Sequence, residues 1–171
     1  MTGFSAETQT QGERLLDLCR KRKLTIATAE SCTGGLLAAL LTEFAGSSDV
    51  LDRGYVTYSN AAKMQAIGVR EATIEEFGAV SAEVAEQMAT GALEKAKVDL
   101  AVSITGIAGP GGGTPEKPVG LVYLCAASRD GRVVAQTLSL GPRSRSEIRH
   151  DSVLAALDLL LRLASSDGSP H

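Results

Sequence analysis

The chain has little of several residue types that mark specialised classes of protein. Tryptophan is absent and aromatic residues make up 4% of the 171 residues, so an aromatic surface for stacking nucleic-acid bases is not expected. One of the two histidines is the last residue, and the three cysteines lie far apart in the chain. This set forms neither a zinc site nor a disulfide framework. We therefore expect no metal, no other cofactor and a reducing compartment.

Excess positive charge and long apolar runs are also missing. Lysine and arginine total 17 against 20 aspartates and glutamates, a net charge of −3, whereas nucleic-acid-binding domains are usually basic. No apolar run approaches the roughly 20 residues of a membrane span, and residues 1–7 lack the features of a secretory signal. These absences predict a cytoplasmic protein that binds neither nucleic acid nor membranes.

The length is typical of one domain, which we predict over residues 1–171 with frayed ends at 1–6 and 165–171. Helical patterns and caps predict helices over 7–22, 36–44, 81–97 and from 144 onward, with short ones after 59 and over 73–78. Apolar runs predict strands over 24–28, 50–58, 98–104, 119–127 and 132–140. Their alternation predicts a three-layer α/β/α sandwich with a mixed, mostly parallel sheet of about five strands. The turn at 129–131 makes the last two strands an antiparallel hairpin.

Ser31 lies between a predicted strand and a predicted helix, in a segment that continues Cys32-Thr33-Gly34-Gly35. Such a position is at the carboxyl edge of the sheet, where open α/β folds bind ligands. It also faces the N–H groups at the start of the next helix, which can hold an anion or an oxyanion. Alternatively, the serine is a simple helix cap, since the nucleophile-elbow pattern G-x-S-x-G is not matched.

A nucleophilic serine needs a base, and Lys63 is the candidate that the topology supplies. Residues 55–63 leave a strand and enter a helix, which brings Tyr58, Asn60 and Lys63 to the same edge as Ser31. A lysine acts as a base only when its surroundings lower its pKa from about 10.4 toward neutrality. The alternative is an ordinary solvated lysine. The internal histidine, His150, falls within the last helix and is more typical of a surface residue.

Two further segments could bind a ligand. The stretch 105–118 is rich in glycine, but it matches neither a P-loop nor a dinucleotide-binding turn. It is either a ligand-facing loop or a flexible crossover. Arg143, Arg145 and Arg149 cluster where the last helix begins, a good place for a phosphate. They could equally form a solvated face.

Several of these segments occur as ordered blocks: 28–35 (TAESCTGG), 54–60 (GYVTYSN), 78–81 (GAVS), 103–110 (SITGIAGP) and 117–120 (KPVG). Together they resemble the C-terminal domain of the CinA family, the nicotinamide mononucleotide deamidases, over about residues 7–163. Larger members carry an N-terminal molybdopterin-binding-like domain, for which this chain has no room, so it looks like the stand-alone form. The resemblance implies hydrolysis of the carboxamide of nicotinamide mononucleotide to nicotinic acid mononucleotide and ammonia.

The resemblance also implies roles for residues. Ser31 would be the nucleophile and Lys63 its base, Tyr58 would hold or relay to that lysine, and Thr105 would lie in the site. Arg145, or else Arg143, would bind the substrate phosphate. The remaining substrate-binding candidates are Glu30, which could pair with the pyridinium charge, Thr33, Asn60, Gly109, and the oxyanion donors near Gly34, Gly35 or Gly106.

Other classes of function stay open. The chain could be a non-catalytic nucleotide-binding module linked to competence or DNA damage, or a serine–lysine amidase for another substrate. Ammonia release separates the binding module from the enzymes. A small-molecule nucleotide is the expected partner, and a homo-oligomer is possible.

Overall fold

The computed structural model describes residues 3–166, and within them five strands form a single sheet in the order β2-β1-β3-β4-β5. The strands are β1 (Ile26–Glu30), β2 (Leu51–Val56), β3 (Leu100–Gly106), β4 (Leu121–Ser128) and β5 (Val133–Ser139). β1 pairs in parallel with both β2 and β3, and β4 pairs antiparallel with β3 and β5. Four strands therefore run in one direction and β4 runs in the other, which confirms the predicted mixed, mostly parallel sheet and its terminal hairpin.

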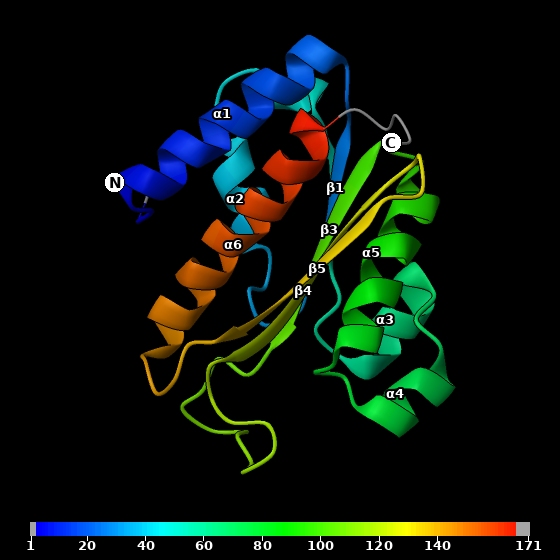
Figure 1. Ribbon diagram of the computed structural model, residues 1–171, viewed down its shortest axis with the longest axis vertical. Helices are drawn as coiled ribbons and strands as arrows, with labels where there is room; N and C mark the ends of the chain where they lie inside the picture. The colour runs from blue at the N-terminus through cyan, green and yellow to red at the C-terminus, as the bar shows by residue number, and fades with distance from the viewer. Residues whose placement is uncertain (1–2, 167–171) are drawn as a thin grey trace.

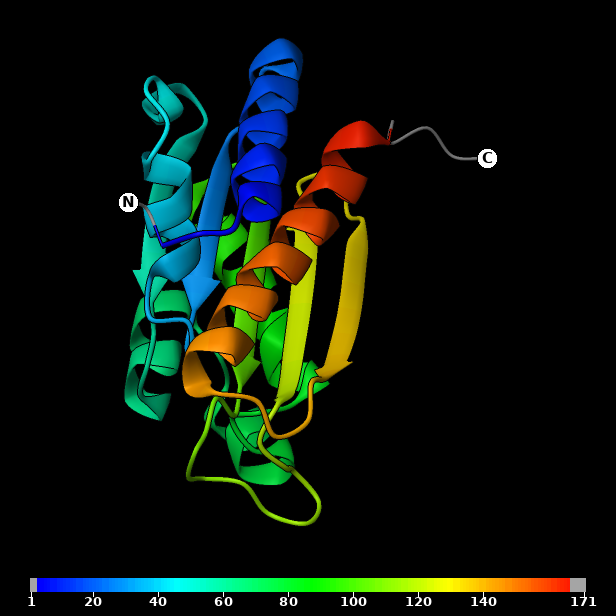
Figure 2. The same cartoon turned by 90° about the vertical axis from the view of Figure 1, so that its left-hand side faces the viewer.

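Helices cover both faces of this sheet (Figures 1 and 2). The first layer consists of α1 (Ala6–Arg22), α2 (Leu36–Thr42) and α6 (Arg145–Ser165). The second consists of α3 (Asn60–Ile67), α4 (Glu71–Phe77) and α5 (Ala82–Ala96). A short 3-10 turn, η1 (Ser47–Asp49), precedes β2. The predicted three-layer α/β/α sandwich is confirmed. None of the helices within the described residues is long and apolar enough to cross a membrane.

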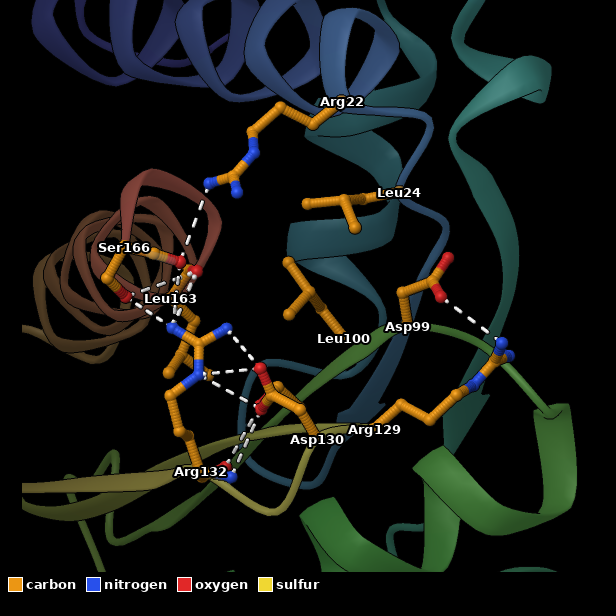
Figure 3. Close-up of a pocket in the computed structure, with 10 residues that line it drawn as sticks. Arg22, Leu24, Asp99, Leu100, Arg129, Asp130, Arg132, Leu163 and Ser166 are labelled. Atoms are coloured by element: carbon orange, nitrogen blue, oxygen red, sulfur yellow. Dashed lines mark hydrogen bonds and ion pairs between the residues drawn. The ribbon is translucent and has the colours of Figure 1, made fainter. Parts of the chain in front are cut away.

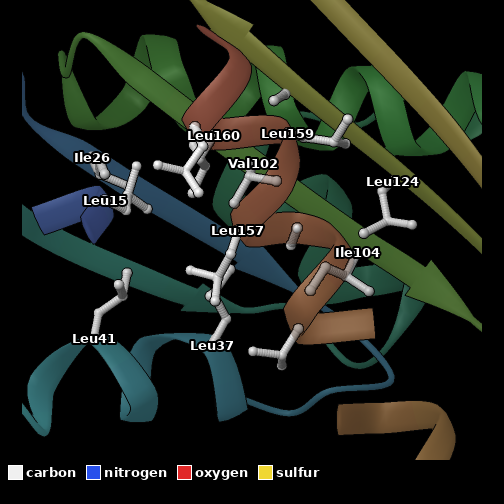
Figure 4. Packing of buried hydrophobic residues seen from close by; sticks show 14 of the residues in the cluster. Leu15, Ile26, Leu37, Leu41, Val102, Ile104, Leu124, Leu157, Leu159 and Leu160 are labelled. Carbon is white, nitrogen blue, oxygen red and sulfur yellow. The ribbon is translucent and has the colours of Figure 1, made fainter. Parts of the chain in front are cut away.

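The two layers pack on the sheet in different ways. On the first face, large aliphatic side chains such as Leu15, Leu37 and Leu157 fill the space between helices and strands (Figure 4). On the second face, the buried side of α5 is made mostly of alanines, so this helix approaches the sheet closely. Gly91 of α5 also touches α3, because a Cβ at this position would lie 1.9 Å from the carbonyl oxygen of Ile67. The position of α3 thus depends on a contact between two backbones.

The predicted caps of α5 and α6 are confirmed. Ser81 accepts a hydrogen bond from the Val84 N–H at 3.2 Å. Ser144 and Glu147 form a complete capping box, with the Glu147 N–H donating to Ser144 Oγ and the Ser144 N–H to Glu147 Oε2. Each N-terminus therefore begins at a serine that supplies an acceptor for a backbone N–H without an intrahelical partner.

The helix predicted over residues 73–78 begins earlier than expected. α4 already begins at Glu71, so Thr73 lies inside the helix, where its hydroxyl accepts from the Gln87 side-chain amide. The oxygen of the same amide accepts from the Arg70 N–H at 2.9 Å. The side chain of Gln87, a residue of α5, therefore binds the backbone at the start of α4. A local sequence pattern does not reveal this contact.

The predicted frayed ends are shorter than expected where the structure covers them. Ser5 caps α1, which begins at Ala6, and Ser165 is the last residue of α6. Phe4 packs its ring against that of His150, with centroids 5.6 Å apart. The rest of the predicted frayed ends, residues 1–2 and 167–171, lies outside the described residues.

Candidate active site

Ser31 and Lys63 meet at the carboxyl edge of the parallel strands. Ser31 directly follows β1, and its N–H donates to the Ile104 carbonyl of β3, so the sheet anchors its backbone. Lys63 Nζ lies 3.0 Å from Ser31 Oγ, a hydrogen-bond distance. Lys63 is 1% exposed and Ser31 9% exposed. A buried amine is therefore in direct contact with the hydroxyl of a serine.

The start of α3 explains how a lysine comes to be buried here. Ser59 caps this helix by accepting from the Ala62 N–H, and Lys63 follows in the first turn. Its amine also donates to the Thr57 carbonyl at 3.0 Å and to the Tyr58 carbonyl at 3.4 Å. Within residues 3–166 no carboxylate forms an ion pair with Lys63. Its positive charge is thus compensated only by neutral oxygens.

Burial lowers the pKa of the Lys63 amine. The direction is the one that a general base requires, because only the neutral amine can accept a proton. Burial raises the pKa of the Cys32 thiol to about 11. That thiol therefore stays protonated, and the hydroxyl of Ser31 is the group in contact with the amine.

The Glu30 carboxylate binds backbone N–H groups of α2, whereas the sequence suggested that it could pair with the pyridinium charge of the substrate. It is 1% exposed, and its two oxygens accept from the N–H groups of Leu37 and Ala38 at 2.9 and 3.1 Å. Glu30 therefore fills the N-terminal end of α2 and does not line the cleft. The expected anion site at the start of this helix is taken by the protein's own carboxylate.

Among the N–H groups considered for the oxyanion, Gly34 is already bound, because its N–H donates to the Ser31 carbonyl at 3.0 Å. Gly35, with φ +99°, caps α2, and Thr33 is fully buried. No backbone hydrogen bond of the described turns and loops uses the N–H of Cys32 or of Thr33. These two groups directly follow the serine in the chain.

Gly106 offers a further N–H. The Ile107 N–H donates to the Leu121 carbonyl of β4. Since successive N–H groups of a strand point to opposite sides, the Gly106 N–H points away from β4, toward the end of β1. A Cβ at Gly106 would lie 2.8 Å from Val122 Cγ2 and 2.9 Å from the Leu121 oxygen, so only glycine fits.

A cleft of about 270 Å³ opens above the Ser31–Lys63 pair. The predicted site residues that line it are Ser31, Tyr58, Asn60, Lys63, Thr105, Gly106, Gly109 and Arg145. Those that do not line it are Glu30, Thr33, Gly34, Gly35 and Arg143. The structure thus brings together residues from the ends of β1, β2 and β3, the glycine-rich loop and the start of α6.

Arg145 extends across the mouth of the cleft. Its Nη1 donates to the Gly109 carbonyl at 2.8 Å and its Nη2 to the Tyr58 hydroxyl at 3.1 Å. The Tyr58 side chain, 62% exposed, therefore contacts Arg145, and only its backbone carbonyl holds Lys63. The proposed relay through the phenol to Lys63 has no counterpart in these contacts.

Arg143 lies outside the cleft. Its guanidinium pairs with Asp151, and it lines a different hollow together with Leu140 and Leu154. Of the two arginines considered for a phosphate, Arg145 is the one that the structure brings to the cleft.

Two residues hold the wall of the cleft at 78–81. Thr105 Oγ1 donates to the Ala79 carbonyl at 2.8 Å. Lys117, from the glycine-rich loop, donates to the carbonyls of Phe77 and Val80 at 2.6 and 2.7 Å. Thr105 was expected in the site, whereas the role of Lys117 as a tie between two loops could not be read from the sequence.

A larger hollow, about 450 Å³, lies at the opposite end of the sheet (Figure 3). Two of the arginines that line it pair with carboxylates, Arg129 with Asp99 at 3.3 Å and Arg132 with Asp130 at 2.9 Å. Ser128 also lines it, but its hydroxyl donates to Asp130, and no lysine or histidine is among the described lining residues. Size alone therefore does not identify the chemical site of this protein.

The fold and the cleft together define an α/β/α sandwich with a buried serine–lysine pair at the carboxyl edge of its sheet. Residues 8–164 match the family model described as the CinA C-terminal domain, and the chain belongs to this family.

Relatives with curated sequences include a "CinA-like protein" of Chlorobaculum tepidum, 50% identical over 165 residues, and one of Mycobacterium marinum, 56% identical over 140 residues. The matches cover 94% and 82% of this chain, which spans only 39% and 33% of the relatives' lengths.

Solved structures with the same fold include a competence/damage inducible protein, CihA, from Agrobacterium tumefaciens. It is 48% identical, has a TM-score of 0.93, and the match covers 94% of this chain and 97% of that one. A CinA superfamily protein from Klebsiella pneumoniae is 33% identical with a TM-score of 0.87, covering 92% and 98%.

Proposed function

We propose that this protein hydrolyses the carboxamide of nicotinamide mononucleotide, giving nicotinic acid mononucleotide and ammonia through an acyl-enzyme on Ser31. The observation that carries the proposal is the 3.0 Å contact between Ser31 Oγ and the buried amine of Lys63. A lysine without a carboxylate partner, whose pKa burial lowers, serves as the base of a serine nucleophile.

The first half-reaction forms the acyl-enzyme. Neutral Lys63 accepts the proton of Ser31 Oγ as this oxygen attacks the amide carbon. The N–H groups of Gly106 and Cys32, two residues that line the cleft, donate to the oxyanion of the tetrahedral intermediate, a contribution of roughly 3–4 kcal/mol for each well-placed donor. The Lys63 ammonium then gives its proton to the amide nitrogen, the C–N bond breaks and ammonia leaves.

The second half-reaction uses the same groups. Lys63 takes a proton from water, whose oxygen attacks the acyl carbon, and the proton returns to Ser31 Oγ as the ester bond breaks. The product is the carboxylic acid, and the serine is regenerated.

The remaining cleft residues suit the rest of a mononucleotide. Arg145 and the Tyr58 hydroxyl stand at the mouth, where a phosphate can accept from both. The pyridinium ring withdraws electrons from its own carboxamide and so activates the carbonyl carbon. Both oxygens of Glu30 are bound by α2, so this carboxylate does not pair with the pyridinium charge.

The test is ammonia release from nicotinamide mononucleotide by the wild type, Ser31→Ala and Lys63→Met. Loss of either member of such a pair should lower kcat by at least about 10³-fold. Lys95→Met is the matched control, because Lys95 is an exposed lysine of α5 away from the cleft. The control should retain full activity.

The outcomes separate the classes of function. Saturable nucleotide binding without ammonia release from the wild type would indicate a binding module and refute the proposal. Acylation of Ser31 by other amides or esters, with no turnover of the mononucleotide, would indicate an amidase for another substrate.

A further inference from the structure

Arg149 binds the segment that directly follows the candidate nucleophile. From α6, its Nε donates to the Cys32 carbonyl at 3.2 Å and its Nη2 to the Thr33 carbonyl at 2.9 Å. The side chain is half-buried, and across the described part of the chain its guanidinium forms no ion pair with a carboxylate. Two consecutive carbonyls are therefore the bound partners of this charge.

These contacts fix the direction of the neighbouring N–H groups. A peptide unit is planar and trans, so the Cys32 carbonyl and the Thr33 N–H point in opposite directions within one plane. The Thr33 carbonyl is coupled in the same way to the Gly34 N–H, which donates to the Ser31 carbonyl at 3.0 Å. Arg149 thus binds the carbonyl groups of two successive peptide units.

Backbone hydrogen bonds hold only parts of this segment: the Ser31 N–H donates to the Ile104 carbonyl, and the Leu36 N–H donates to the Thr33 carbonyl at 3.1 Å. Gly34 and Gly35 have φ of +59° and +99°, so residues 31–35 form an irregular turn between β1 and α2. In the described turns and loops no backbone N–H donates to the Cys32 carbonyl, so Arg149 is the donor that this carbonyl has there. A guanidinium, which presents several N–H donors in a rigid plane, can bind this carbonyl and that of Thr33 at once and polarise both peptides.

We propose that Arg149 is a positioning residue for the reaction at Ser31. By binding the Cys32 and Thr33 carbonyls, it fixes the two peptide units that follow Ser31 and so keeps Ser31 Oγ at hydrogen-bond distance from Lys63. Arg149 does not line the cleft, unlike Arg145, so it acts through the backbone and not on the substrate. The inference rests on the proposed deamidase activity.

The test compares Arg149→Met and Arg149→Lys with the wild type in steady-state turnover of nicotinamide mononucleotide. Displacing a nucleophile by about 1 Å can cost about 100-fold, and that fall in kcat is expected for Arg149→Met, with KM nearly unchanged. Arg149→Lys should recover part of the loss, because one ammonium restores a charge and a donor but not the planar fork. Arg162→Met is the matched control, since Arg162 lies on the same helix and pairs with Asp158 at the surface.

A second readout keeps this inference separate from the proposed function. A fluorophosphonate labels an activated serine through the same nucleophile and oxyanion donors, without any nucleotide. Labelling of Ser31 should be slower in Arg149→Met than in the wild type, at temperatures where thermal unfolding shows both to be folded. Absence of wild-type turnover with normal labelling would refute the deamidase alone.

Three results would overturn the role of Arg149. Wild-type labelling and turnover in Arg149→Met would show that the loop needs no such support. A raised KM with unchanged kcat would make Arg149 a substrate-binding residue. If the activity lost in Arg149→Met equals the fraction of protein that is unfolded, Arg149 is a residue that only stabilises the fold.

Discussion

Replacing Gly91 by alanine should damage the site from a distance. Gly91 lies on α5, and a Cβ there would be 1.9 Å from the Ile67 carbonyl oxygen, while real Cβ contacts essentially never fall under 3.0 Å. The two backbones must therefore separate by about 1 Å. Ile67 is the last residue of α3, the helix that carries Lys63.

The size of the effect follows from two opposing contributions. Alanine in a helix is favoured over glycine by about 1 kcal/mol, whereas overpacking a core costs about 1–3 kcal/mol or more. Because the obstacle is a backbone carbonyl that no rotamer change can move, we expect a net loss of about 2 kcal/mol. For a domain of this size that lowers Tm by about 4–8 °C. Moving Lys63 Nζ from 3.0 Å to beyond hydrogen-bond distance of Ser31 Oγ should lower kcat by about 100-fold.

Thermal unfolding followed by circular dichroism, together with the ammonia assay, measures both effects. Gly12→Ala on α1 is the matched control, because its Cβ would meet only side chains, the nearest being a Phe44 ring carbon at 3.1 Å. That ring can shift, so the control should be neutral or slightly stabilising. Unchanged Tm and activity in Gly91→Ala would refute the idea that this contact sets the position of α3.

Three further predictions concern charges and caps. Because the pKa of Lys63 is lower in the native state, the native protein loses the Lys63 proton at a lower pH than the unfolded chain does. Burying the charged amine therefore destabilises the fold fully below the folded pKa, and this destabilisation has disappeared above the unfolded pKa of about 10.4. In urea unfolding, wild type should therefore gain stability relative to Lys63→Met between these limits, and a constant difference would contradict this. Glu30→Ala leaves the N–H groups of the buried Leu37 and the half-buried Ala38 without their acceptor and should cost about 2–3 kcal/mol, with Glu30→Gln costing less. Ser144→Ala should cost about 1 kcal/mol by removing the cap of α6, and equal denaturant midpoints for mutant and wild type would count against that cap.

The sequence predicted the layers and the meeting of Ser31 with Lys63 because both depend on topology. Residues that leave parallel strands gather at one sheet edge whatever their detailed packing. The contact distance and the burial of the amine depend on α3, whose position is set by Gly91 of α5, far along the chain. No local pattern carries that information.

Glu30 illustrates a signal that was present but not used. Successive side chains of a strand point to opposite faces. Since Ser31 faces Lys63 and the second layer, Glu30 had to face the first layer, where it meets α2. The choice between Arg143 and Arg145, in contrast, depended on Asp151, a residue two turns into α6 that holds Arg143 away from the cleft.

The two members of the serine–lysine pair are attached to opposite layers of the sandwich. Ser31 leads into α2 on the face of α1 and α6, whereas Lys63 belongs to α3 on the face of α5 (Figure 1). A partially opened molecule in which the second layer has separated keeps its hydroxyl but loses its base. The rate at which an electrophile modifies Ser31 in mild denaturant is therefore a direct gauge of how tightly α3 stays docked, and it provides a local opening free energy for one layer of the fold.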